Sequence, residues 1–207
     1  MKVLLVNGSP HKEGCTYTAL REVAETLNAE GAETEIFWLG RQPVSGCTAC
    51  GACAETGRCA IDDCVNAFAE LAKGADGFVF GSPVHYASAS GAVTSFMDRL
   101  FQSGKATLFM KPAAAVVCAR RAGTTAAFDQ LNKYFTISQM PVVSSRYWNM
   151  VHGAKPEDAL KDAEGLYTMR VLARNMAYIL KCLEAGARAG VPLPANETPV
   201  KTNFIRD

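Results

Sequence analysis

The sequence contains no apolar run of membrane-spanning length and no excess of charge of one sign. A membrane-spanning helix needs about 20 consecutive apolar residues, and the net charge of this 207-residue chain is +1. Such a balance gives no reason to expect binding to nucleic acid or to an anionic membrane. The first residues also lack the basic segment and cleavage site of a secretory signal. We therefore expect a cytoplasmic protein with neither nucleic acid nor membrane as a partner.

Two common nucleotide-binding motifs are absent as well. An apolar run over Lys2–Asn7 predicts a buried strand, and the loop 8–18 (GSPHKEGCTYT) follows it. The loop has neither the Gly-Lys-Ser/Thr ending of a nucleoside-triphosphate loop nor the G-x-G-x-x-G dinucleotide fingerprint. Free backbone N–H groups and the positive end of a helix dipole would still point into it. This pattern favours a single terminal phosphate, as in a mononucleotide cofactor; an ordinary strand-to-helix turn capped by serine or threonine is the alternative.

Apolar strand patterns alternate with amphipathic helix patterns along the whole chain. This alternation predicts a single α/β domain over residues 1–207, with a doubly wound five-stranded parallel sheet and helices on both faces. A polar segment at 192–207 predicts an extended C-terminal tail. The expected strands lie at Lys2–Asn7, 34–39, 77–80, 112–118 and 141–145, and the main expected helices at 16–30, 62–72, 90–101, 124–135 and 164–185.

Three loops follow predicted strands at the same end of the expected sheet, where ligands of such folds bind. They cover residues 8–18, 81–88 and 119–125, and together they offer a phosphate-binding loop, an aromatic and imidazole wall, and a glycine-containing backbone. A flat heteroaromatic group with a phosphate tail fits this combination. His85 is either a proton donor or stacking group there, or a structural residue. Arg120 and Arg121 either attract the phosphates of a donor nucleotide or are simply solvated.

Eight cysteines need an explanation in a chain expected to meet a reducing cytosol, where a disulfide framework does not form. Four of them form the spacing Cys47-x2-Cys50-x2-Cys53-x5-Cys59, which suits a [4Fe–4S] cluster. Tetrahedral zinc is a second interpretation, and a packed loop without metal is a third. The other patterns place Cys64, Cys118 and Cys182 in the core. The aromatic segment 147–152 either lines the pocket, forms a subunit contact or packs internally.

The first loop, the Ser82-Pro83-Val84-x-Tyr86 segment and the cysteine spacing together resemble the NADPH-dependent FMN reductase and iron–sulfur flavoprotein group of the flavodoxin-like superfamily. The family's first loop reads Gly-Ser-Pro-Arg-x-x-Gly-Asn-Thr, and here His11 replaces the arginine and Cys15 the asparagine. The resemblance implies three groups of FMN-binding residues. They are Ser9, His11, Thr16 and Thr18 at the phosphate, Pro83, Val84, His85 and Tyr86 along the isoalloxazine ring, and Ala119, Arg120 and Gly123 at its far edge.

The resemblance also implies an activity, because bound FMN carries the redox chemistry and no side-chain nucleophile is required. It predicts an NAD(P)H-dependent oxidoreductase whose acceptor is a flavin, a quinone, a nitroaromatic compound or a redox protein, and which forms a homodimer or homotetramer. One alternative is an electron-transfer module that links ferredoxin-like partners through a cluster and FMN. A flavin-binding redox sensor is another. A cluster at Cys47, Cys50, Cys53 and Cys59 would favour one-electron transfer, whereas a metal-free loop would favour hydride-driven reduction.

Overall fold

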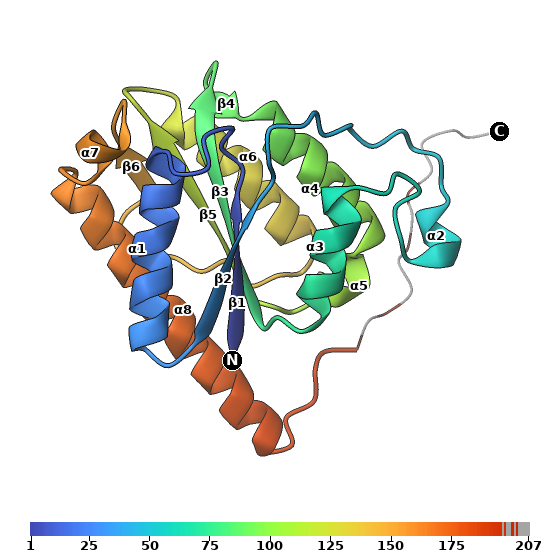
Figure 1. Cartoon of the computed structure of the whole chain (residues 1–207). Coiled ribbons are helices and arrows are strands. Elements are labelled where there is room, and N and C mark those ends of the chain that lie inside the picture. The colour runs from blue at the N-terminus through green and yellow to red at the C-terminus, as the bar shows by residue number, and fades with distance from the viewer. Residues whose placement is uncertain (196, 198–199, 201, 203–207) are drawn as a thin grey trace.

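The computed structural model describes residues 1–195, 197, 200 and 202, so the tail predicted at 192–207 lies partly outside the described residues. Five strands form a parallel sheet in the order β2-β1-β3-β5-β6, and the short β4 pairs antiparallel with the end of β3 (Figure 1). The strands are β1 (Lys2–Asn7), β2 (Glu33–Trp38), β3 (Gly77–His85), β4 (Ser88–Ala89), β5 (Ala113–Ala119) and β6 (Met150–His152).

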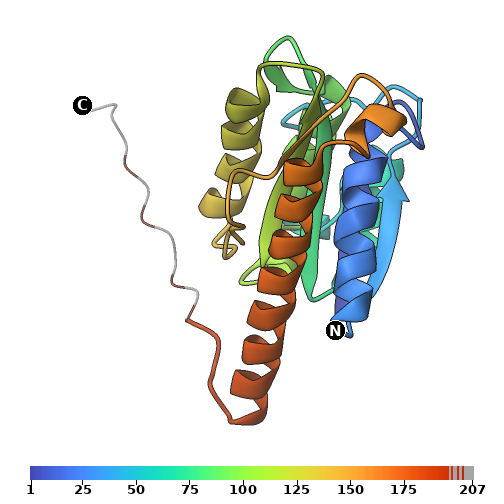
Figure 2. The same cartoon turned by 90° about the vertical axis from the view of Figure 1, so that its left-hand side faces the viewer.

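Helices cover both faces of the sheet, as the alternating pattern predicts, and Figure 2 shows these layers from the side. One face packs against α1, α7 and α8, and the other against α3, α4 and α6. This arrangement and strand order make the fold a flavodoxin-like, doubly wound one. The helices are α1 (Cys15–Ala29), α2 (Cys53–Thr56), α3 (Cys64–Lys73), α4 (Gly91–Ser103), α5 (Lys105–Leu108), α6 (Thr124–Ile137), α7 (Pro156–Ala159) and α8 (Ala163–Arg188).

Alternation of apolar side chains along β1 explains why both faces must be covered. Val3 and Leu5 pack with α1 and α8, whereas Leu4 and Val6 pack with α3 and α4, and all four are fully buried. A strand that is apolar on both sides is stable only between two layers, because successive side chains point to opposite faces. The carboxyl ends of the strands therefore remain the accessible place for a ligand.

The last strand differs from the prediction. Residues 141–145 form only a single bridge, between Val142 and Ala113, and the fifth parallel strand is β6 (Met150–His152). The chain leaves the sheet between these two contacts, and the side-chain amide of Asn149 donates to the Ala115 carbonyl at 3.0 Å. A side chain thus takes over a backbone bond of the ladder, which an apolar-pattern argument does not detect.

The segment after residue 80 was predicted to be a loop but continues β3 and turns into a hairpin with β4. Val84 pairs with Ala89 and His85 with Ser88, so Tyr86 and Ala87 form the two-residue turn. Both have positive φ, 51° and 60°, as a type I′ turn requires. The hairpin projects past the end of the sheet (Figure 1).

The sequence patterns placed Cys64, Cys118 and Cys182 in the core. Cys118 is buried in the sheet and Cys64 is half-buried against the core, as expected, but Cys182 lies on the solvent side of α8 and its expected core position was wrong. No helix in the described part of the chain combines the length and apolar character needed to cross a membrane.

Candidate functional site

The loop after β1 is fixed by its own side chains. Asn7 is fully buried, and its amide donates to the Lys12 carbonyl at 2.9 Å and accepts from the Ser9 N–H at 3.1 Å. Gly8 donates to the Gly81 carbonyl, and a Cβ at Gly8 would lie 1.7 Å from a Val93 methyl. Only glycine therefore allows β1, β3 and α4 to approach each other at this point.

Helix α1 begins without a side-chain cap. The first backbone bond of the helix runs from the Thr18 N–H to the Gly14 carbonyl at 3.0 Å, and no side chain accepts from its first turn. Helices α3, α4 and α8, in contrast, are capped by Asp63, Ser90 and Asp162. The predicted alternative of a turn capped by serine or threonine is thus not what the structure shows. The free N–H groups of the first turn remain available to an anion.

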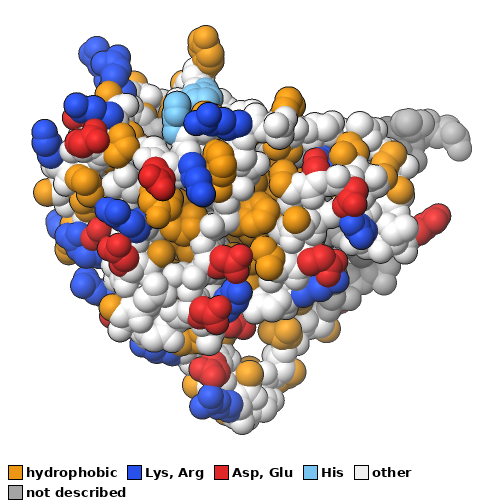
Figure 3. Space-filling view, in the orientation of Figure 1, with side chains coloured by type: hydrophobic (Ala, Val, Ile, Leu, Met, Phe, Trp, Pro, Cys, Tyr) orange, Lys and Arg blue, Asp and Glu red, His pale blue; other side chains and the backbone are white. Residues whose placement is uncertain are grey.

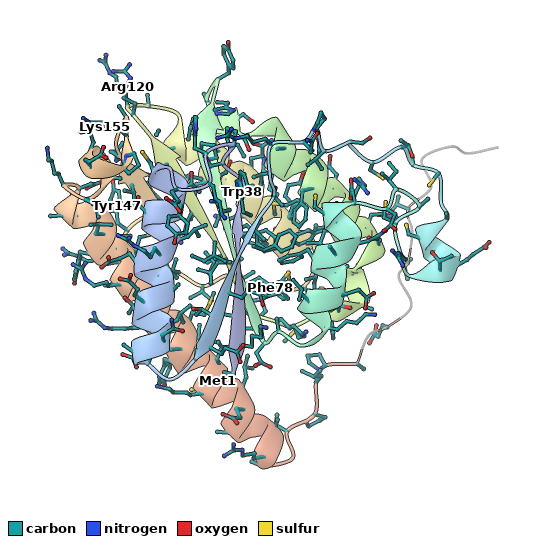
Figure 4. The ribbon with its side chains drawn as sticks, viewed as in Figure 1. Met1, Trp38, Phe78, Arg120, Tyr147 and Lys155 are labelled. Atoms are coloured by element: carbon teal, nitrogen blue, oxygen red, sulfur yellow. The ribbon has the colours of Figure 1, made fainter. Side chains whose placement is uncertain are left out.

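A hollow of about 500 Å³ opens beside this helix start, at the carboxyl ends of β1, β3 and β5, and we call it the strand-end hollow. Histidine surface, together with lysine and arginine side chains, appears at this end of the molecule in Figure 3. Arg120 and Lys155, both labelled in Figure 4, lie on the rim of the strand-end hollow. The lining residues are Ser9, His11, Glu13, Gly14, Cys15, Thr16, Pro83, Val84, His85, Cys118, Ala119, Arg120, Gly153, Ala154, Lys155 and Pro156.

The structure gathers most of the predicted cofactor residues at this hollow and places three elsewhere. Those on its lining are Ser9, His11, Thr16, Pro83, Val84, His85, Ala119 and Arg120. Thr18 lies one helical turn into α1 and donates its hydroxyl to the Gly14 carbonyl. Tyr86 stands fully in solvent at the hairpin tip. Gly123 is not among the lining residues and packs against the β3–β4 turn, where a Cβ would be 2.7 Å from Ala87 Cα.

Sequence reasoning missed the segment 153–156, which forms one side of the hollow. It follows β6, and the incorrect placement of the last strand hid that relation. The Gly153 carbonyl accepts from the Cys15 thiol at 3.5 Å, so the cysteine that departs from the family pattern contacts this segment. Burial raises the pKa of Cys15 and also that of Cys118 in the same lining. Both thiols therefore stay protonated at neutral pH.

A second hollow, of about 290 Å³, lies between the segment 47–61 and α4, and we call it the cysteine hollow. All four cysteines of the predicted motif line it: Cys47, Cys50, Cys53 and Cys59. Ala49 and Gly51 both have positive φ, 54° and 77°, which bends the chain sharply around Cys50. Among the described residues, no three potential metal-binding side chains are grouped closely enough to hold a metal ion as they stand.

The chemistry of this donor set fits an iron–sulfur cluster. Four thiols from one short loop match the number of ligands that a [4Fe–4S] cluster takes. The backbone N–H of Ala52, together with the Thr48 side chain, lowers the pKa of Cys50, so this thiol becomes a thiolate more readily. Cys59 is held from the other side, because Asn66 accepts from its N–H at 3.1 Å and donates to its carbonyl at 2.9 Å.

Arg99 of α4 forms the floor of the cysteine hollow and was not singled out from the sequence. Only 1% of its side chain is exposed, and its Nε lies 3.2 Å from Cys59 Sγ. Both terminal nitrogens also donate to the Asp63 carboxylate, at 2.6 and 2.9 Å. Burial disfavours both charges, but their mutual attraction outweighs it, so the pKa of Arg99 is raised and that of Asp63 lowered.

Sequence comparisons relate this chain to known proteins. The model of the NADPH-dependent FMN reductase family matches residues 1–155. An iron–sulfur flavoprotein of Methanocaldococcus jannaschii is 32% identical over 192 residues, which are 89% of this chain and 100% of that protein. An iron–sulfur flavoprotein of Methanosarcina thermophila is 24% identical over 188 residues, 89% of this chain and 97% of that protein.

Solved structures confirm the fold. A RosB structure with bound 8-demethyl-8-formylriboflavin-5'-phosphate superposes with a TM-score of 0.70 and 16% identity, covering 100% of this chain and 94% of that one. A flavodoxin from the domain Archaea gives a TM-score of 0.59 and 14% identity, covering 87% and 99%. The family model spans all three loops and the similarity to the first relative spans nearly the whole chain, so the chain belongs to the NADPH-dependent FMN reductase family and is related to the iron–sulfur flavoproteins.

Proposed function

We propose that this protein is an FMN-containing oxidoreductase that also holds a [4Fe–4S] cluster and passes electrons between the two groups. FMN would occupy the strand-end hollow and the cluster the cysteine hollow. The observation that carries the proposal is that Cys47, Cys50, Cys53 and Cys59 all line one hollow whose floor is a buried arginine. When bound, FMN takes up and releases one or two electrons and the cluster exchanges single electrons.

The chain's residues would bind and orient these groups. The uncapped first turn of α1 and the buried Thr16 hydroxyl would hold the FMN phosphate. Pro83 and Val84 would supply the apolar side of the ring site, and the backbone at Ala119 its polar edge. Four thiolates would ligate the iron atoms. The expected partner is a ferredoxin-like electron carrier, and a homodimer or homotetramer remains our expectation for the assembly.

The positive rim of the strand-end hollow favours a second candidate, in which NAD(P)H supplies the electrons as hydride. Arg120 and Lys155 both lie on this rim, where they could bind the phosphates of the dinucleotide. His85 would then be available beside the ring as a proton donor. The acceptor in this candidate is a flavin, a quinone, a nitroaromatic compound or a redox protein, and the cysteine loop would hold zinc or no metal.

The decisive experiment is quantitation of iron, sulfide and flavin on the full chain purified without oxygen, followed by addition of NADH or NADPH. We expect FMN together with about four irons per chain. Flavin without iron, even after reconstitution with iron and sulfide, would contradict the cluster and leave the hydride-driven reductase. Rapid bleaching of the flavin by NADH or NADPH would support that second candidate. Absence of flavin after incubation with FMN would contradict both.

A further inference from the structure

Arg99 is unusual because a charged side chain on the inner face of a helix is buried completely. It lies on α4 among Phe96, Met97 and Leu100, which all pack into the core. Burying a guanidinium is costly unless every donor finds a partner and the charge is compensated. The groups that accept hydrogen bonds from Arg99 therefore indicate which parts of the structure this side chain holds in place.

Each N–H of the guanidinium group has an acceptor. The five donors of an arginine go to Cys59 Sγ, to both carboxylate oxygens of Asp63, and to the carbonyls of Ser45 and Ile61. Ser45 precedes the first cysteine of the loop, and Ile61 follows the last. One side chain from α4 thus joins the beginning and the end of the cysteine segment.

The contact with Cys59 differs in kind from the others, because Cys59 is one of the four proposed cluster ligands. Reduction adds negative charge to a cluster and its sulfurs. A fixed N–H donor and a positive charge at a ligating sulfur stabilise that added charge, and hydrogen bonds to the sulfurs are among the factors that set cluster potentials. Burial strengthens the effect, because little solvent screens the guanidinium.

We propose that Arg99 is a positioning residue that holds Cys59 at the cluster and raises the cluster's reduction potential through its N–H···S contact. Asp63 opposes this effect, since its negative charge compensates part of the guanidinium charge. The proposal rests on the proposed function, because it presumes a cluster in the cysteine hollow.

The test compares two arginine–aspartate pairs whose carboxylates, Asp62 and Asp63, are neighbours in the chain. Arg58 pairs with Asp62 at 2.6 Å and is largely exposed, whereas Arg99 is buried and pairs with the partly exposed Asp63. Arg99→Lys keeps the charge and loses the planar fork. We expect its ammonium group to be drawn to Asp63 and away from Cys59. Arg58→Lys makes the same chemical change where no contact with a thiol exists among the described residues, and it serves as the matched control.

The measurement is an anaerobic redox titration of the full chain with FMN bound, followed by electron paramagnetic resonance, alongside iron content. At the midpoint potential of the unchanged protein, we expect Arg99→Lys to lower the ratio of reduced to oxidised cluster about tenfold, a shift of about 59 mV for one electron. Arg58→Lys should leave the ratio unchanged. Asp63→Asn should shift the potential in the opposite, positive direction, because it leaves the guanidinium charge less compensated.

An unchanged potential in Arg99→Lys, or a negative shift in Asp63→Asn, would overturn the proposal. If Arg99→Lys retains FMN but loses iron, Asp63→Asn decides on its own, because it keeps the guanidinium and its contact with Cys59. Absence of iron from the unchanged protein is a different result, because it contradicts the proposed function itself. The iron content of the unchanged protein is therefore measured before any variant is titrated.

Discussion

The strand-end hollow and the cysteine hollow are built by different means. The first lies where β1, β3 and β5 end, and backbone contacts such as Gly8 N–H to the Gly81 carbonyl fix its walls. The second lies under the segment between β2 and α3, in which α2 is the one regular element among the described residues. Its shape depends on Arg99 and Asn66 rather than on a sheet. The fold thus provides one site directly, and a few side chains add the other.

Cys50→Ser is expected to have the largest effect, because it should remove the iron and leave FMN bound. Loss of one thiolate should reduce the iron content from about four per chain to near zero, while FMN stays bound because the strand-end hollow shares no residue with the cysteine hollow. Iron and flavin quantitation measures both. Cys182→Ser, at the exposed cysteine of α8, is the control and should leave both contents unchanged. Full iron content in Cys50→Ser would exclude this residue as an essential ligand.

Thr16→Ala should have the converse effect: it should weaken the binding of FMN and leave the iron content unchanged. A hydroxyl bonded to a phosphate contributes about 1.5–3 kcal/mol, so FMN affinity should fall by about ten- to a hundredfold. Fluorescence titration of the flavin-free protein measures the dissociation constant. Thr18→Ala is matched to it, because that hydroxyl already donates to the Gly14 carbonyl. Equal losses in the two variants would show that the hydroxyl of Thr16 has no special place at the phosphate.

Thiol reactivity should distinguish the sites in reduced, iron-free protein. The pKa of Cys50 is lowered by the Ala52 N–H, whereas burial raises the pKa of Cys15 and Cys118. The thiolate is the reactive form, so iodoacetamide near pH 7.5 should label Cys50 several-fold faster than either thiol of the strand-end hollow. Peptide mass spectrometry over time gives the order. Earlier labelling of Cys118 would contradict both the burial and the pKa direction.

The smallest expected effect concerns acid. The pKa of Asp63 lies below its ordinary value of 3.8, because its bonds with Arg99 and the Val65 N–H outweigh burial. A lowered pKa in the folded state stabilises the protein above pH 3.8, and this contribution is lost as the pH falls through the folded value. Since the carboxylate is partly exposed, Asp63→Asn should reduce the pH-dependent part of the free energy of unfolding by only about 0.5–1 kcal/mol. Urea unfolding between pH 3 and 7 measures it, and an unchanged slope would contradict the assignment.

Much of the fold could be predicted because the buried strands are continuous apolar runs. Lys2–Asn7 and the run after Pro112 are apolar on both faces, so no other element type accommodates them as well. The strand at 150–152 escaped prediction because its place in the ladder depends on the Asn149 amide and on the excursion before it. The strand-end hollow followed from the strand order, but residues 153–156 were missed together with that strand.

Arg99 shows which signal was available and overlooked. It stands three residues after Phe96, on the face of α4 that the apolar pattern assigns to the core. A charged residue at such a position needs a buried partner, and four nearby thiols would have been a reason to look for one. Tyr86 is the opposite case, since the resemblance placed it along the isoalloxazine ring, but the two-residue turn directs its side chain into solvent. Turn geometry of this kind depends on strand pairing and not on residue type.

Helix α4 has a further consequence, because it runs from the loop after β1 to the floor of the cysteine hollow. At its beginning the Ser90 hydroxyl donates to the Gly8 carbonyl, and nine residues later Arg99 reaches Cys59. At 1.5 Å per residue these two points lie about 14 Å apart along a stiff rod. The helix therefore fixes the spacing between the loop after β1 and the cysteine segment within each chain. If FMN and a cluster occupy the two hollows as proposed, this spacing helps to set the distance over which electrons pass between them. Inserting one helical turn between Ser90 and Arg99 would lengthen that spacing by about 5 Å, and under the proposed function we expect it to slow the exchange of electrons between the two groups.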